Sequence, residues 1–146
     1  MIWVLTLYCA ASSPSWGDYV ALRNRYEFQT EDSCVEWAKM YAKAIYKPQM
    51  PGIASVEALI EDDKKQFLDS RPGMKILESK GLTTADGKVL RSFEYVPDRQ
   101  GDWEQVSYGE EGDFYLIFTI SSRSKTGYGK SIPVYEELIE RYREKP

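Results

Sequence analysis

The sequence predicts an α+β fold: an antiparallel β-sheet meander flanked by helices on both faces, as in an α/β/α sandwich. Three observations predict it. Four strand-like segments follow one another between residues 74 and 120, a helical segment lies on either side of them in the chain, and Phe114–Ile120 carries large apolar residues on both of its faces. A strand that is apolar on both faces is typically central and covered by a layer on each side.

Residues 1–52 are expected to form an N-terminal β-β-α unit that extends this sheet. Alternation of large and small or polar residues predicts strands near 3–8 and over 19–28. Thr30, followed by two acidic residues, is typical of a helix N-terminus. The following apolar residues recur at helical spacing, which predicts a helix that ends near Lys47: Cys34, Ala38, Tyr41, Ala42 and Ile45. Two prolines and a glycine within 48–52 then interrupt the chain.

Residues 53–146 are expected to form an α-β-β-β-β-α part, and the two parts together one compact domain. Ser55 is the expected N-cap of the first helix, which Arg71-Pro72-Gly73 ends. Strands are expected over 74–79, 88–96, 103–108 and 114–120, with Asp86-Gly87 as a hairpin signal. The last helix is expected to begin near Ser131, with Pro133 in its first turn and one apolar face: Tyr135, Leu138, Ile139 and Tyr142.

The composition argues against several classes of function. The 146 residues include no histidine, which excludes histidine triads, histidine proton relays and mixed Cys/His metal sites. The formal net charge is -4, all of it contributed by residues 53–146, which disfavours direct nucleic-acid binding. No apolar run approaches the roughly 20 residues of a membrane-spanning helix. We therefore expect no cofactor, no metal, no nucleic-acid partner and no membrane span.

The expected location is the cytoplasm, where Cys9 and Cys34 are two reduced, buried thiols. Export, including to a periplasm, is the alternative if residues 1–12 act as a signal, since Ala10, Ala11 and Ser12 resemble a cleavage site. In an exported protein, a disulfide between Cys9 and Cys34 is the alternative to two reduced thiols.

Two groups of residues are candidates for contacting a partner protein. The first is Trp103 near Asp98 and Arg99 at a turn, and the second is Trp16 with Tyr19 in a segment containing Pro14 and Gly17. Tryptophan is enriched among the residues that carry most of the binding energy at protein interfaces. The alternative is that both tryptophans belong to the core.

A basic, hydroxyl-rich loop over residues 121–130 is a candidate anion site. It contains Arg123, Lys125, Tyr128 and Lys130 ahead of the expected last helix, whose N-terminus attracts negative charge. The order of residues is not that of a Walker A loop. The alternative is a strand-to-helix connection kept in solvent by its charges. The acidic runs at 61–63 and 110–113 are expected to be solvated surface.

Several stretches within residues 54–144 carry a resemblance to a known family: the helix Val56–Leu68, the run Pro72–Leu77, the Asp86-Gly87 hairpin into Arg91–Tyr95, Gly112–Ile117, Ser121–Ser124 and the last helix from Ile132-Pro133. In these stretches the chain resembles the Mog1/PsbP-like family, which includes DcrB-like proteins and the chaperones of type VI secretion effectors. The resemblance implies an α/β/α sandwich and a non-enzymatic role: binding another protein, assisting its assembly, or guarding an apolar segment. Residues 1–52 do not match the strands with which this family usually begins.

The expected function is therefore that of a non-enzymatic protein-binding module, such as a chaperone or adaptor. An inhibitor or immunity protein is an alternative, because the acidic surplus of residues 53–146 suits a basic macromolecular partner. A second alternative is an anion- or phosphate-binding protein that uses the 121–130 loop. Exposed sheet edges are compatible with a homodimer.

Overall fold

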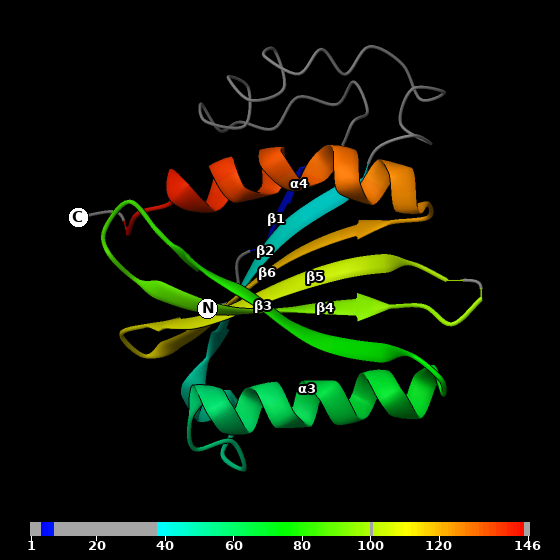
Figure 1. Ribbon diagram of the computed structural model, residues 1–146. Helices are drawn as coiled ribbons and strands as arrows, with labels where there is room; N and C mark the ends of the chain where they lie inside the picture. The colour runs from blue at the N-terminus through cyan, green and yellow to red at the C-terminus, as the bar shows by residue number, and fades with distance from the viewer. Residues whose placement is uncertain (1–3, 8–37, 100, 145–146) are drawn as a thin grey trace.

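The computed structural model describes residues 4–7, 38–99 and 101–144. It confirms the α+β class and the antiparallel sheet, which has six strands in the order β1-β2-β6-β5-β4-β3 (Figure 1). The strands are β1 (Val4–Leu7), β2 (Lys39–Tyr46), β3 (Lys75–Thr83), β4 (Val89–Val96), β5 (Trp103–Glu111) and β6 (Phe114–Ser122). Two helices, α3 (Val56–Ser70) and α4 (Lys125–Glu140), and a short 3-10 turn, η1 (Lys47–Gln49), complete the described elements.

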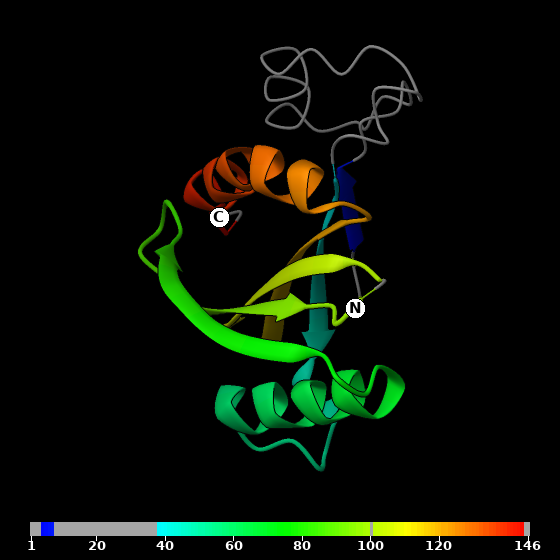
Figure 2. The same cartoon turned by 45° about the vertical axis from the view of Figure 1, so that its right-hand side comes forward.

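The two helices lie on opposite sides of the sheet, which Figures 1 and 2 show from two directions. Strand β6 lies between β2 and β5, and its side chains alternate between two apolar clusters. Tyr115 belongs to the cluster under α3, while Leu116 and Phe118 belong to the cluster under α4. The expectation that 114–120 is an internal, largely buried strand is therefore confirmed.

Several local signals are confirmed. The Ser55 side chain accepts a hydrogen bond from the Ala58 backbone N–H at 3.1 Å and caps α3. Gly87 has a φ of +85°, the left-handed conformation that the β3–β4 turn requires. Both β3 and β5 run further than expected, and β3 does so through an irregularity in its pairing with β4 between Ser79 and Leu82.

The helix predicted over residues 30–47 is wrong wherever the structure describes the chain, because Lys39–Tyr46 is strand β2. Its eight residues pair in continuous register with β6, and Met40, Ala42 and Ala44 alternate into the cluster under α4. This short segment satisfies both a helical and a strand period, and the pairing with β6 decides between them. Where the structure describes residues 1–52, they contribute β1 and β2 to the sheet. The β-β-α unit expected there is wrong in its helix, because residues 39–46 form a strand.

The last helix begins six residues earlier than predicted, at Lys125. Ser124 caps it by accepting a hydrogen bond from the Gly127 backbone N–H at 2.9 Å, so Pro133 lies inside the helix and not in its first turn. Pro133 has no backbone N–H, so the carbonyl of Gly129 lacks its helical partner. Both residues are exposed, so water can satisfy that carbonyl. The buried face of α4 is the predicted one.

Other predictions fall outside the described residues: the strand at 19–28, the Trp16–Tyr19 pair, and both cysteines. Among the described residues, no helix is long and apolar enough to cross a membrane.

Candidate functional site

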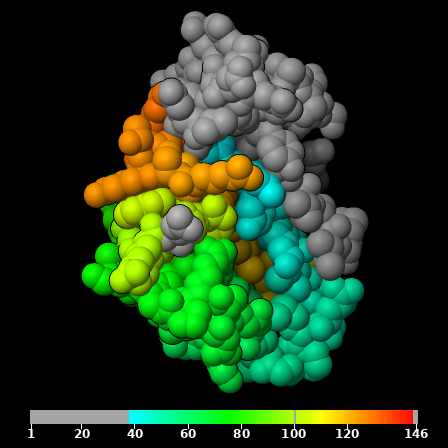
Figure 3. Space-filling model, turned by 90° about the vertical axis from the view of Figure 1, so that its right-hand side faces the viewer, coloured from blue at the N-terminus to red at the C-terminus, as the bar shows by residue number. Residues whose placement is uncertain are grey.

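Three residues from the two predicted sites come together at one end of the sheet: Trp103, Lys125 and Tyr128. The ring centroids of Trp103 and Tyr128 are 6.2 Å apart, and the Lys125 Nζ lies 5.7 Å from the Trp103 ring centroid. Trp103 is half-buried, Lys125 is exposed and Tyr128 is buried. We call this group the Trp103 patch. Figure 3 shows this side of the molecule, with the start of α4 beside the β4–β5 end of the sheet.

The turn between β6 and α4 creates the patch. Trp103 opens β5 opposite Ser122, the last residue of β6. The Ser124 cap then starts α4 two residues later, so that the first turn of the helix lies over the beginning of β5. A cation beside an aromatic ring is attracted to the negative face of the π-system. Lys125 therefore covers part of the Trp103 ring and leaves the rest accessible.

Tyr128 fixes the inner side of the patch. Its hydroxyl donates to Glu94 Oε1 at 2.9 Å and lies 3.3 Å from Gln105 Oε1. Burial raises the pKa of Tyr128, and its hydrogen bond to Glu94 raises it further, so the hydroxyl stays a neutral donor. Because its one proton points at Glu94, Tyr128 does not serve the anion site predicted from the sequence.

Most of the basic loop expected over residues 121–130 is helix. Residues 125–130 form the first turns of α4, and Arg123, Lys125 and Lys130 are exposed on or just before it. Asp98 and Arg99 lie exposed in the connection that leads into Trp103. Of the sequence-predicted cations, Lys125 is the one for which a contact with the Trp103 ring is seen among the described residues.

An exposed apolar residue that sequence reasoning missed lies on the same face of the sheet. Leu77 of β3 is opposite Glu94 of β4, the residue that Tyr128 contacts, and its side chain is 52% exposed. Directly opposed residues of antiparallel strands share a face, so Leu77 faces the α4 side. The adjacent large residues in Ile76-Leu77 are the signal that could have found it, since an outer strand cannot bury both.

A polar cluster lies between α3 and the sheet. The Tyr108 hydroxyl donates to Asp63 of α3, and the Tyr95 hydroxyl therefore donates to Tyr108, at 2.7 Å. Burial raises the pKa of Asp63 despite the hydrogen bond from Tyr108. These groups attach α3 to the sheet.

Nearby, Arg71 is 3.1 Å from the carboxylate of the buried Glu104. Burial raises the pKa of Glu104, an effect that the positive charge of Arg71 partly offsets. Arg71 follows the end of α3, and Glu104 lies next to Trp103 on β5. This ion pair holds the end of α3 against the strand that carries the patch.

A shallow, open hollow of about 530 Å³ lies at the start of α3, beside β4 and β5. Its walls mix apolar residues with charges of both signs, including Val56, Val89, Glu57, Arg91 and Glu110. Val89 is 72% exposed there. Within the described ranges, no group of three or more His, Cys, Asp or Glu side chains is placed to hold a metal ion.

Comparison with known proteins gives a likeness in fold. No protein-family model and no curated protein matches the chain. A crystal structure of a Pseudomonas aeruginosa protein of unknown function, PA94, described as a candidate regulator, is similar over 100% of this chain and 84% of that one. The TM-score is 0.59 and the sequence identity is 14%. At that identity the likeness concerns the fold alone.

Proposed function

We propose that this chain is a non-enzymatic protein-binding module of the chaperone or adaptor kind, and that it contacts its partner through the Trp103 patch. The observation that carries the proposal is a half-exposed tryptophan held in place by Tyr128 beneath it and Lys125 beside it. A rigid, partly exposed aromatic loses little conformational entropy when a partner covers it. Tryptophans in such settings are frequent hot spots of protein interfaces.

The buried ionisable groups support a binding role over catalysis. Asp63 accepts from Tyr108, Glu104 is paired with Arg71, and Tyr128 donates to Glu94. Each of these hydrogen bonds joins two elements of the fold. A catalytic acid or base needs a free lone pair or proton directed at a substrate, whereas these groups are directed at one another.

We also propose that the fold is an α/β/α sandwich of the Mog1/PsbP-like kind. Support comes from the placement of α3 and α4 on opposite sides of the sheet. The resemblance of residues 54–144 to that family then favours guarding or assembling another protein. A cytoplasmic location is part of the same proposal.

The test is capture of a partner from lysate of the native host with tagged wild-type protein and two patch variants, Trp103→Ala and Lys125→Glu. Val89→Ala is the matched control, because Val89 is an apolar residue that is 72% exposed and lies in the hollow next to α3, away from the Trp103 patch. We expect one protein to be retained by the wild type and by Val89→Ala and lost from Trp103→Ala. Circular dichroism confirms that each variant is folded.

Retention of the same protein by Trp103→Ala would contradict the proposed patch. The identity of the captured protein separates the alternatives: a secretion effector or membrane segment supports a chaperone, whereas a nuclease or other basic toxin supports an inhibitor. Turnover of a substrate by the pure protein, abolished by one point mutation, would overturn the non-enzymatic proposal.

A further inference from the structure

Strand β3 is an outer strand of the described sheet. It is hydrogen-bonded to β4 on one side and has no neighbouring strand among the described residues on the other. From Lys75 to Ser79 its pairing with β4 is regular over five residues, before the irregularity that precedes Leu82. In such a segment every second residue directs its backbone N–H and C=O groups outward, where another strand can pair with them.

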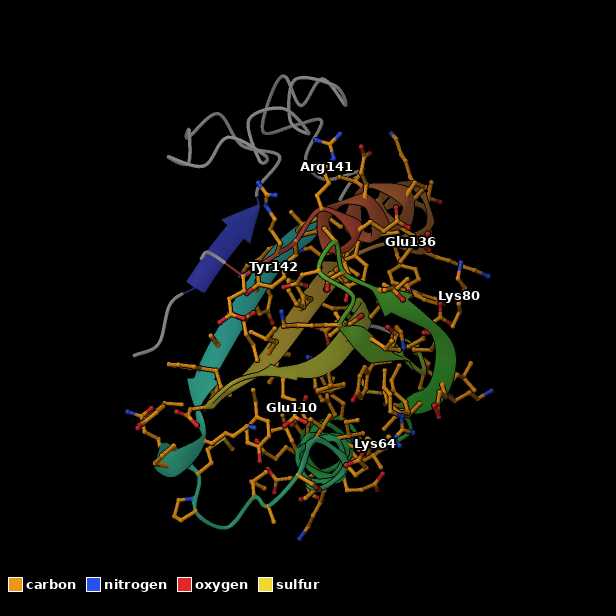
Figure 4. All side chains as sticks on the ribbon, turned by 90° about the vertical axis from the view of Figure 1, so that its left-hand side faces the viewer. Lys64, Lys80, Glu110, Glu136, Arg141 and Tyr142 are labelled. Carbon is orange, nitrogen blue, oxygen red and sulfur yellow. The ribbon has the colours of Figure 1, made fainter. Side chains whose placement is uncertain are left out.

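The side chains of this segment have a defined character. Leu77, at its centre, is a large apolar residue that is 52% exposed. Lys75 and Lys80 are exposed on either side of it, and Lys80 lies at the margin of the molecule (Figure 4). The one acidic residue, Glu78, is neutralised by two hydrogen bonds from Arg91, at 3.0 and 3.1 Å. The edge is therefore apolar at its centre and positively charged at both ends.

We propose that the Lys75–Ser79 edge receives an extended acidic and apolar segment of the partner protein as an additional strand. This inference rests on the proposed binding function and names the chemistry of the partner. Backbone hydrogen bonds hold such a strand, and alternate side chains give it specificity. In the added strand, the side chains on the α4 side should include an apolar residue beside Leu77. An acidic residue should lie two positions before it, two positions after it, or at both, since residues two apart in a strand share a face.

Charge decides between a partner segment and a second copy of this chain. Pairing β3 with β3 of a second copy would bring the cations Lys75 and Lys80 of both chains into one short ribbon. Like charges on adjacent strands are destabilising. An acidic segment neutralises the same cations. Leu77 also shares its face of the sheet with Glu94 and the Trp103 patch, so one partner can contact both.

The probe is a synthetic peptide of sequence Thr-Glu-Thr-Val-Thr-Glu-Thr, and its matched control carries Lys in place of both Glu. The readout is amide hydrogen exchange of residues 75–79 in the full chain. With the acidic peptide at about ten times its dissociation constant, exchange of the outward amides should slow about tenfold. The basic peptide should have no effect. In the variant Lys75→Glu/Lys80→Glu the preference should reverse.

Leu77→Lys should abolish the slowing, and Val89→Lys, an equally drastic change at a more exposed site on β4 outside the register of Lys75–Ser79, should preserve it. Unchanged exchange at 75–79, equal slowing by both peptides, or slowing in Leu77→Lys would overturn the proposal. Protection that grows with protein concentration without peptide would overturn it in favour of a second copy. If these fail while Trp103→Ala still loses the partner, the proposed function stands without the added strand.

Discussion

The Tyr128 ring lies 6.2 Å from the Trp103 ring, and the Tyr128 hydroxyl is fixed on the carboxylate of Glu94. Three elements, β4, β5 and α4, are therefore joined at the point where the tryptophan reaches the surface. A side chain held in this way presents one conformation to a partner, which is the condition for a strong contact at low entropic cost.

Gly109→Ala should destabilise the protein by about 1–3 kcal/mol, because the new Cβ overpacks the core. A Cβ on Gly109 would lie 2.2 Å from Cδ2 of Leu90, which is fully buried and must move. Urea unfolding measures the change. Gly52→Ala is the control, since nothing lies within 4 Å of its Cβ position. Equal effects of the two substitutions would contradict the close contact of Leu90 with β5.

A chain of hydroxyls under α4 should show strong coupling. Tyr135 donates to the Phe118 carbonyl at 2.9 Å, so Ser107 donates to Tyr135, at 2.6 Å, and Ser92 donates to Ser107, at 2.7 Å. Tyr135→Phe should cost about 1–3 kcal/mol, because the buried Ser107 donor loses its acceptor. In a double-mutant cycle with Ser107→Ala, the two losses should fall short of additivity by at least about 0.5 kcal/mol. Strict additivity would show that the two hydroxyls do not interact.

Asp63→Asn should change how stability depends on pH. Burial raises the pKa of Asp63 above its usual 3.8, so the folded state favours the protonated carboxyl. That contribution is complete below the unfolded pKa and is lost as the pH rises through the folded pKa. Asn does not ionise and can still accept from Tyr108. The variant should therefore gain stability relative to the wild type as the pH rises, measured by urea unfolding across the acid range; a constant difference would refute this.

Alkaline pH should unfold the protein cooperatively. Burial raises the pKa of five core tyrosines above the ordinary value of 10.0: Tyr95, Tyr108, Tyr128, Tyr135 and Tyr142. Their contribution to stability is complete below pH 10 and is lost as the pH rises towards their folded pKa values. Tyrosinate absorbance and far-ultraviolet circular dichroism should change together. Ionisation of these tyrosines in a protein that keeps its native circular dichroism would contradict their burial.

The sequence predicted the elements that local signals define. The Ser55 cap, the Asp86-Gly87 turn and the doubly apolar 114–120 strand lie where they were expected. The failures have non-local causes. Residues 39–46 carry an apolar spacing compatible with a helix, and only their pairing with β6 makes them a strand.

The sequence predicts the residues of the Trp103 patch as members of two separate sites and does not predict their contact. The sequence predicts Trp103 as a partner contact, and Lys125 and Tyr128 as anion ligands, from segments more than twenty residues apart. Their contact depends on α4 starting at Lys125, which the position of Pro133 obscured. The exposure of Leu77 is not predictable from local sequence alone, because it depends on β3 being an outer strand of the described sheet, which is a property of the strand order.

The most direct test of partner binding through the Trp103 patch is site-specific photo-crosslinking in the native host. A photo-reactive amino acid replaces Lys125 in the Trp103 patch, or Leu68 in a control protein, since Leu68 is 42% exposed on α3 on the other side of the sheet. We expect a covalent adduct with the co-purifying partner from position 125 and none from position 68. An adduct from position 68 alone, or none from position 125 while the partner still co-purifies, would contradict partner binding through the patch.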